Sequence, residues 1–248
     1  MIRFLLVCIT VIGFLILSIP ILIIEWIIGK FKPYTKDISS LHLIQAVFRF
    51  ILCLTGVEVT VIGEELVPTD EAVLYIGNHR SFFDILLTYT RCPRLTGYIA
   101  KAEMEKIPLL SNWMHYLHCL FLDRKDIKKG LKTILSGIEL IKSGISVCIF
   151  PEGTRNRNAS DLELLEFHEG SFKIATKAKC PIIPIAINNS ADIFEAHFPK
   201  MKPAKVVVEY GKPIYPDELS KEDKKHIGEY TQNVIREMLE KNKPLTEA

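Results

Sequence analysis

Several features are scarce or missing in this chain of 248 residues. Its 31 Lys and Arg are nearly balanced by 29 Asp and Glu, so the net charge is only +2, and a dedicated nucleic-acid-binding protein is not indicated. The chain has no internal repeat or low-complexity stretch, and 48% of it is hydrophobic, which excludes a disordered or collagen-like chain. Because long hydrophobic runs are confined to the N-terminal part, the composition also excludes a multi-pass transporter.

Short motifs of several common enzyme classes are also absent. There is no G-x-S-x-G elbow, no Walker loop and no G-x-G-x-x-G turn. The six cysteines form no C-x-x-C pair and lie mostly in apolar segments, which indicates reduced thiols and a cytosol-facing protein. His115, His118 and Cys119 resemble a fragment of a metal site, but no further ligands follow at a recognised spacing. We therefore expect no metal.

One long segment near the N-terminus contains no charge. It covers residues 4–24, which as a helix would extend about 31 Å, close to the thickness of a bilayer's hydrocarbon core. Pro20 should kink this helix near its end. Trp26 and Lys30 follow, as at the cytosolic interface of a membrane. The run is too long for a signal peptide and lacks a cleavage pattern, so we expect it to be retained.

A second apolar stretch, residues 41–54, is too short to span a bilayer. His42, Gln45 and Arg49 share one stripe of this helix, so it is amphipathic and suited to lie in one leaflet or pack on the first segment. The two segments could form a span with an interfacial helix, a kinked hairpin in one leaflet, which we favour, or core helices of a soluble domain. We predict that residues 1–56 bind the cytosolic face of the cell membrane.

Residues 57–248 have the pattern of an α/β domain, because short apolar runs alternate with helical stretches. We expect a three-layer mixed sheet flanked by helices and preceded by the hydrophobic two-helix motif. The expected strands cover residues 57–62, 72–76, 98–100, 119–122, 145–150, 181–187 and 205–210. The clearest helices cover residues 126–142 and about 219–243. The first of these should carry six apolar residues on one face: Ile127, Leu131, Ile134, Leu135, Ile138 and Ile141.

Residues 78–84, N-H-R-S-F-F-D, follow an expected buried strand and open a helix. Ligands bind at such strand-to-helix turns in α/β sheets. On one continuous helix His79 and Asp84 would point about 140° apart, so they can meet only if His79 lies in the preceding turn. Asp84 could then hold one imidazole nitrogen and leave the other free as a base. The alternative is a helix cap, because Ser81 and Asp84 also fit a capping box.

Residues 150–155, F-P-E-G-T-R, end another expected strand. Arg155 on such a loop suits a phosphate, which a guanidinium can bind through two hydrogen bonds, although a plain turn remains possible. Lys101 and Arg124 each follow a strand and could converge with Arg155 at one sheet edge. The next helix carries further lysines that form either a solvated face or a docking patch for lipid headgroups, coenzyme A or an acidic carrier protein: Lys125, Lys128, Lys129 and Lys132.

Together these blocks resemble the 1-acyl-sn-glycerol-3-phosphate acyltransferase family of glycerolipid acyltransferases. Residues 78–84 match N-H-x-S-x-x-D, and residues 150–155 match F-P-E-G-T-R in full. Residues 118–124 resemble a G-x-I-F-I-x-R block in which His118 replaces the glycine and Arg124 is retained. Lys101 also resembles a basic position of the family. The resemblance covers roughly residues 62–187.

The resemblance implies transfer of an acyl group from a thioester, acyl-CoA or acyl carrier protein, to the sn-2 hydroxyl of lysophosphatidic acid. The product is phosphatidic acid, and no cofactor is implied. His79 would be the general base and Asp84 would orient it. Backbone N–H groups near the His79 turn or at Gly153 could stabilise the oxyanion. The substrate-binding residues would be Lys101, Arg124, Glu152, Gly153, Thr154 and Arg155, with Glu152 more suited to orient Arg155 or the loop than to touch phosphate.

Other functions remain open. The acceptor could be glycerol 3-phosphate or another lysophospholipid. A non-catalytic lipid-binding protein is a second alternative, which the intact His79 and Asp84 disfavour. A membrane-anchored hydrolase is a third, which the missing nucleophile elbow disfavours. The sequence does not indicate the preferred acyl length or the oligomeric state.

Overall fold

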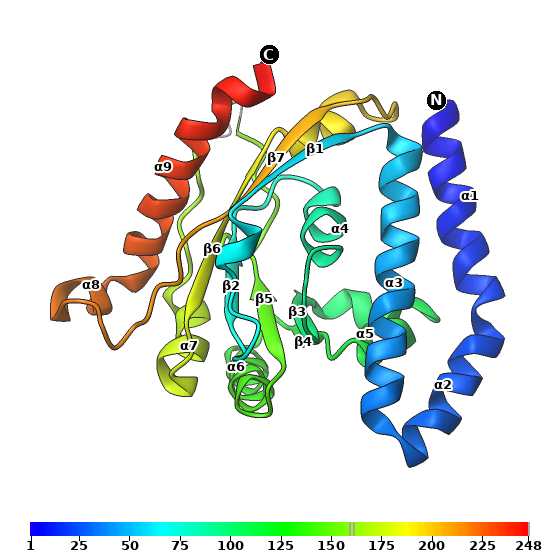
Figure 1. Cartoon of the computed structure of the whole chain (residues 1–248), viewed down its shortest axis with the longest axis horizontal. Helices are drawn as coiled ribbons and strands as arrows, with labels where there is room; N and C mark the ends of the chain where they lie inside the picture. Colours follow the sequence, from blue (N-terminus) through cyan, green and yellow to red (C-terminus); the bar gives the residue numbers. More distant parts are fainter. Residues whose placement is uncertain (159, 161, 248) are drawn as a thin grey trace.

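The computed structural model describes residues 1–158, 160 and 162–247 (Figure 1). Within them, the strands form one seven-stranded sheet in the order β1-β7-β6-β2-β5-β3-β4. All neighbouring strands are parallel except β6 and β7. All the expected strands are found, with bounds shifted by a few residues: β1 Glu58–Ile62, β2 Leu74–Gly77, β3 Thr96–Lys101, β4 Leu120–Leu122, β5 Ser146–Ile149, β6 Ile182–Asn188 and β7 Lys205–Tyr210.

Helices cover both faces of the sheet, which gives the predicted three layers. On one face lie α3 (Pro33–Thr55), α4 (Phe83–Tyr89) and α5 (Leu110–Tyr116), with α1 (Ile2–Leu17) and α2 (Ile19–Phe31) outside them. On the other face lie α6 (Ile127–Lys142), α7 (Lys173–Ala178) and α9 (Ile227–Glu247), preceded by α8 (Lys221–Lys225). Short 3₁₀ helices connect these elements: η1 Glu64–Leu66, η2 Ala102–Lys106, η3 Glu169–Phe172, η4 Ser190–Ile193 and η5 Glu195–His197.

Strand alternation explains why the two layers have separate cores. Tyr75 of β2 packs with the cluster under α3 and α4, whereas Leu74 and Ile76 pack with the cluster under α6, α7 and α9. Successive side chains of a strand point to opposite faces, so β2, buried on both sides, reads as a continuous apolar run. Its carboxyl end, where the polar residues 78–84 begin, is therefore held between two packed layers.

The N-terminal helices form a hairpin. α1 and α2 are bent by 48° relative to each other at Ser18, and Pro20 stands in the first turn of α2, as a kink near the end of the segment requires. The indole of Trp113 in α5 donates to the Ser18 hydroxyl at 2.9 Å. α3 then runs back along α1 and α2 (Figure 1).

The polar stripe of α3 binds the α/β domain. The Gln45 amide donates to the carbonyl oxygens of Tyr89 and Cys92 at 3.2 and 2.9 Å. Arg49 donates to the Thr90 carbonyl at 3.1 Å. These carbonyls lie at the C-terminal end of α4, where helix geometry leaves acceptors without partners. α3 therefore lies between the outer helices and the domain, while His42 is exposed.

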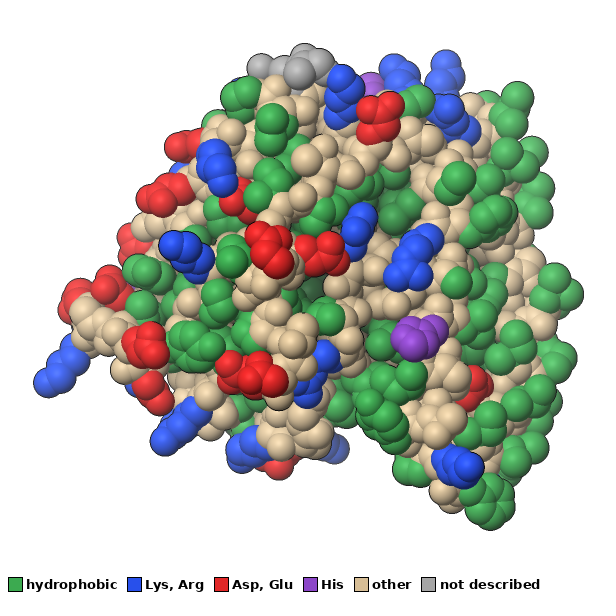
Figure 2. All heavy atoms as spheres, viewed as in Figure 1, with side chains coloured by type: hydrophobic (Ala, Val, Ile, Leu, Met, Phe, Trp, Pro, Cys, Tyr) green, Lys and Arg blue, Asp and Glu red, His purple; other side chains and the backbone are tan. Residues whose placement is uncertain are grey.

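The outer face of the hairpin is strongly apolar. Ile9, Ile12 and Leu17 of α1 expose 58, 58 and 78% of their surface, and Figure 2 shows hydrophobic side chains gathered along the outer margin over α1 and α2. By length and composition, α3 alone, or α1 and α2 together, could cross a membrane. Exposed apolar surface of this extent indicates a binding face.

The apolar face of α6 is only partly buried. Ile138 and Ile141 of α6 are buried, but Ile127, Leu131 and Leu135 are 88, 55 and 53% exposed. The reason lies in packing against α7, because a Cβ at Gly137 would approach Ile174 to 2.8 Å. α6 thus turns its glycine side to α7 and leaves part of its apolar face to solvent. The expected helix over 219–243 is observed as α8 and α9.

The cysteines provide a test of this packing. All six are free in the described residues, and four are buried. Burial raises the pKa of Cys92 and Cys119 to about 11 and that of Cys180 to about 12, and holds the pKa of Cys148 well above its ordinary value.

Since the thiolate is the reactive form, we expect maleimide at neutral pH to label the exposed Cys53 first and Cys8 more slowly. Intact mass spectrometry should show the remaining four thiols labelled only after denaturation; rapid labelling of all six would contradict the fold.

Candidate functional site

The site begins where β2 ends. His79 lies in the turn between β2 and α4, and Asp84 lies in the first turn of α4. His79 Nδ1 is 2.8 Å from Asp84 Oδ2. The same oxygen accepts the backbone N–H groups of Arg80 and Ser81 at 2.7 and 2.8 Å. The carboxylate, which is fully buried, thus folds the turn and binds the imidazole at once.

Both interpretations of residues 78–84 are compatible with this geometry. Ser81 Oγ accepts the Phe83 N–H at 3.0 Å, and Asp84 accepts the Ser81 N–H, as in a capping box at the start of α4, while the same carboxylate also binds the imidazole. A carboxylate facing Nδ1 favours the tautomer with its proton on that atom, which leaves the lone pair of Nε2 available. The imidazole also stacks on Phe150, with ring centroids 4.4 Å apart and planes at 15°. The arrangement suits a general base.

A second carboxylate holds the turn from the other side. Glu152 is buried, and its two oxygens accept the N–H groups of His79 at 2.7 Å and Leu165 at 3.0 Å. Burial raises the pKa of Glu152, and these two N–H groups oppose the rise. Both oxygens are therefore engaged with backbone, which favours the loop-orienting role over contact with substrate.

Asn78 fixes the same turn to the sheet. Its side-chain amide donates to the carbonyl of Ile187 at 2.9 Å and accepts the N–H of Ile187 at 2.8 Å. These bonds resemble one step of a strand ladder between β2 and β6. A side chain thus continues the pairing after the backbone of β2 has turned away, which gives His79 a rigid support.

The expected oxyanion donors are already occupied. The N–H groups of His79, Arg80 and Ser81 bind Glu152 and Asp84, and that of Gly153 donates to the Phe150 carbonyl at 3.0 Å. An N–H bonded within the fold cannot also stabilise a developing oxyanion at full strength. The expectation that these particular groups form an oxyanion hole is therefore not supported.

Arg155 lies beside the turn and forms an ion pair with Glu195, which the sequence did not indicate. Its guanidinium stacks over the ring of Phe82 at 3.7 Å, and Nη1 donates to Glu195 Oε1 at 3.0 Å. Glu195 also accepts the Ser81 hydroxyl at 2.7 Å and the Phe82 N–H at 2.9 Å. One carboxylate from η5 therefore joins the turn of residues 78–84 to the loop of residues 150–155. Forty residues separate Glu195 from Arg155, so no local motif could have shown it.

The other predicted basic residues end neighbouring strands. Lys101 ends β3 and is paired in register with Leu122 of β4, two residues before Arg124. Gly153 adopts φ +70°, and a Cβ there would lie 3.8 Å from the Arg124 guanidinium carbon, which places Arg124 beside residues 150–155. Thr154 is exposed. All these residues lie at the carboxyl edge of the sheet, but the contacts of Arg155 are with Phe82 and Glu195.

A groove of about 1170 Å³ opens beside Arg155. Its lining includes Arg80 and Phe82 of the turn and several residues between 189 and 198 after β6. Of the predicted site residues, Arg155 lines this groove, whereas His79, Lys101 and Arg124 do not. The groove is larger than a phosphate requires and has both cationic and aromatic surfaces. It can therefore accept a phosphorylated amphiphile rather than a bare anion.

No metal site is found in the part of the chain that the structure describes, where no three His, Cys, Asp or Glu side chains gather. His118 instead lies 2.9 Å from the Asp37 carboxylate. Its φ is 58°, in the left-handed region that favours glycine. The backbone thus keeps the conformation that the family's glycine implies at this position.

A family model described as Acyltransferase matches residues 58–188, which contain the His79–Asp84 pair and residues 150–155. The chain belongs to the Acyltransferase family. The match ends at the last residue of β6, so the hairpin of α1 to α3 and the Glu195 loop lie outside it.

Similar proteins share one description. The 1-acyl-sn-glycerol-3-phosphate acyltransferase of Saccharomyces cerevisiae is 28% identical over 78% of this chain, which spans 62% of that protein. The probable 1-acyl-sn-glycerol-3-phosphate acyltransferase of Mycoplasma pneumoniae is 28% identical over 84% of the chain and 79% of that protein. The crystal structure of the 1-acyl-sn-glycerophosphate acyltransferase PlsC from Thermotoga maritima superposes with a TM-score of 0.80 at 25% identity, covering 98 and 97% of the two chains.

The buried carboxylate leads to a first prediction. Asp84→Asn keeps an oxygen for the Arg80 and Ser81 N–H groups but removes the charge that stabilises an imidazolium at His79. We expect acyl-transfer kcat to fall about 100-fold or more while the unfolding temperature changes little. Asp70→Asn, at an exposed position between η1 and β2, is the control. Unchanged kcat in Asp84→Asn would show that the pair is structural.

Glu195 leads to a second prediction. Glu195→Gln keeps one acceptor oxygen for the Phe82 N–H, and its amide NH₂ can donate to the Ser81 hydroxyl, but it removes the charge of the ion pair that holds Arg155. We expect the KM for an anionic acceptor to rise about 3- to 10-fold, because the guanidinium is no longer oriented, with a smaller effect on kcat. Glu237→Gln on the exposed surface of α9 is the matched control. A fall in KM would show instead that Glu195 competes with the acceptor for Arg155.

Proposed function

We propose that this protein transfers an acyl group from a thioester to the sn-2 hydroxyl of lysophosphatidic acid and forms phosphatidic acid. The observation that carries the proposal is the 2.8 Å contact between the His79 and Asp84 side chains. The guanidinium of Arg155 lies beside the same turn and lines an open groove. The activity of the similar proteins from yeast and Thermotoga supports the choice of acceptor.

The reaction needs one base and no covalent enzyme intermediate. His79 Nε2 takes the proton of the acceptor hydroxyl as its oxygen attacks the thioester carbonyl. The tetrahedral intermediate then collapses, the C–S bond breaks, and the imidazolium returns the proton to the leaving thiolate. Asp84 stabilises the imidazolium between the two steps. A positioned base contributes about 10²- to 10⁴-fold to such a rate.

Arg155 is the proposed ligand of the acceptor phosphate. Only Nη1 is engaged by Glu195, and the stack on Phe82 fixes the plane of the guanidinium, so the opposite edge can bind phosphate oxygens. Lys101 and Arg124 add positive charge at the same sheet edge. Each charge-assisted hydrogen bond is worth about 1.5–3 kcal/mol. The donor, acyl-CoA or acyl carrier protein, would approach from solvent.

The exposed apolar face of α1 and α2 gives the enzyme a place at the membrane. Acceptor and product are lipids, and drawing an acyl chain into water costs about 0.8 kcal/mol per CH₂ group. A site at the surface of a leaflet avoids this cost. We propose that α1 and α2 lie in the cytosolic leaflet and that α3 joins them to the α/β domain.

An assay with purified full-length protein in detergent tests the function. Acyl-CoA is offered with lysophosphatidic acid, glycerol 3-phosphate or water as acceptor. We expect phosphatidic acid as the main product, near-complete loss of it in His79→Ala, and a raised KM with lower kcat/KM in Arg155→Ala. His226→Ala, at the exposed C-cap position that follows α8, is the control for the histidine. Free fatty acid without acceptor would indicate a hydrolase, acylated glycerol 3-phosphate a different acceptor, and full activity of His79→Ala would refute the mechanism.

A further inference from the structure

An aromatic path leads from α1 to an exposed loop of the α/β domain. Phe4 of α1 stacks on Phe194, with ring centroids 5.4 Å apart and planes at 12°. Phe194 packs edge-on against Phe198, again with centroids 5.4 Å apart. Phe194 is buried, whereas Phe198 exposes 72% of its surface. This stack of rings connects α1 to the loop that carries Phe198.

The loop that carries Phe198, residues 194–202, has a defined backbone. The Lys200 N–H donates to the His197 carbonyl at 2.7 Å, and the Lys202 N–H to the Ile193 carbonyl at 3.1 Å. The side chain of Met201 is buried in the core under α3. Phe198 is thus held outward by an anchored loop, next to an apolar surface that already extends along α1. A patch continuous with a larger apolar face indicates a shared binding partner.

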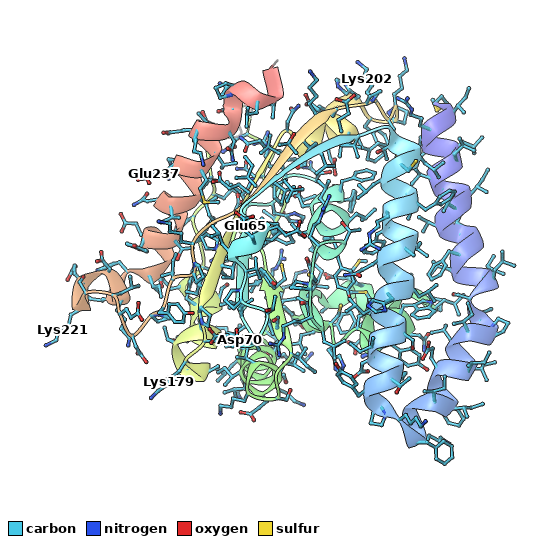
Figure 3. All side chains as sticks on the ribbon, in the orientation of Figure 1. Glu65, Asp70, Lys179, Lys202, Lys221 and Glu237 are labelled. Atoms are coloured by element: carbon cyan, nitrogen blue, oxygen red, sulfur yellow. The ribbon has the colours of Figure 1, made fainter. Side chains whose placement is uncertain are left out.

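The loop also carries positive charge. Lys200 and Lys202 are exposed, and no ion pair is found for either within the described residues. Figure 3 shows Lys202 near the N-terminal end of α1. Of the nearby carboxylates, Glu195 is engaged by Arg155, and Asp192 lines the groove. An exposed aromatic side chain beside unpaired lysines suits the headgroup region of an anionic bilayer.

The same loop forms a wall of the candidate site. Phe194, Glu195 and Phe198 line the groove that contains Arg155. A single-chain lipid whose phosphate lies at Arg155 could therefore follow aromatic side chains to α1. The loop therefore contacts α1 through Phe194 and lines the groove that contains Arg155, the proposed phosphate ligand.

We propose that loop 194–202 is a second lipid-binding surface of this protein, separate in sequence from the N-terminal hairpin, which brings the mouth of the Arg155 groove to an anionic membrane. Phe198 would enter the interface while Lys200 and Lys202 bind lipid phosphates. The inference deepens the proposed function, because it says how a membrane-embedded acceptor reaches the site.

Binding of the full-length protein to vesicles tests the surface directly. Vesicles of phosphatidylcholine alone, or with 30% phosphatidylglycerol, would be used without substrates at about 0.1 M salt. We expect Lys200→Glu/Lys202→Glu to lower binding to the anionic vesicles about tenfold and to affect phosphatidylcholine vesicles little. Phe198→Ser should lower binding to both. Lys221→Glu/Lys225→Glu changes the charge equally on α8, which lies at the opposite end of the molecule (Figure 3), and should have a much smaller effect.

Turnover distinguishes this inference from the proposed function. The lysine variants should acylate acceptor in detergent micelles as fast as wild type but lose several-fold in rate on acceptor in anionic vesicles. Unchanged vesicle binding, or equal loss in the α8 control, would overturn the inference while leaving the function intact. If folded variants lose the same rate in micelles and vesicles, the loop binds substrate and the inference is overturned. A change in oligomeric state caused by the variants would also overturn the inference. If wild type acylates no lysophosphatidic acid, the function fails, whereas vesicle binding still tests the loop.

Discussion

The structure of the site depends on one buried carboxylate. Asp84 Oδ2 accepts hydrogen bonds from the His79 ring and from the backbone N–H groups of Arg80 and Ser81. A buried charge is costly unless hydrogen bonds compensate it, and the three hydrogen bonds to Oδ2 fix the conformation of the turn. The same bonds that stabilise the turn hold the imidazole in the tautomer of a base. Removing the carboxylate would therefore affect the shape and the chemistry of the site together.

Two further carboxylates extend this principle to the neighbouring loops. Glu152 holds the backbone of His79 and Leu165, and Glu195 joins Ser81, Phe82 and Arg155. In each case an acidic side chain of one loop organises donors of another. The proposed base and the proposed phosphate ligand are thus preorganised by acidic groups that need not touch the substrate, which reduces the entropy lost when the substrate binds.

The hairpin of α1 to α3 is part of the same packed structure. Leu41, Ile44 and Ile51 of α3 are buried in the cluster that also contains Tyr75 of β2. Gln45 and Arg49 bind carbonyls at the end of the helix that carries Asp84. The elements proposed to meet the membrane are therefore continuous with those that support the site, and a rigid connection of this kind would hold the site at a defined height above the lipid.

The sequence alone determined the strands and the kink beside Pro20, because each follows from local periodicity or from a single residue. It offered the contact of His79 with Asp84 as one of two interpretations. It did not determine the outward turn of Ile127, Leu131 and Leu135, which follows from the close contact of Gly137 with Ile174. Nor did it indicate the attachment of α3 to α4, the hydrogen bond from the His79 N–H to Glu152, or the contacts of Glu195. These features join segments 40 or more residues apart or depend on how helices pack, and only the folded chain brings such groups within hydrogen-bonding distance.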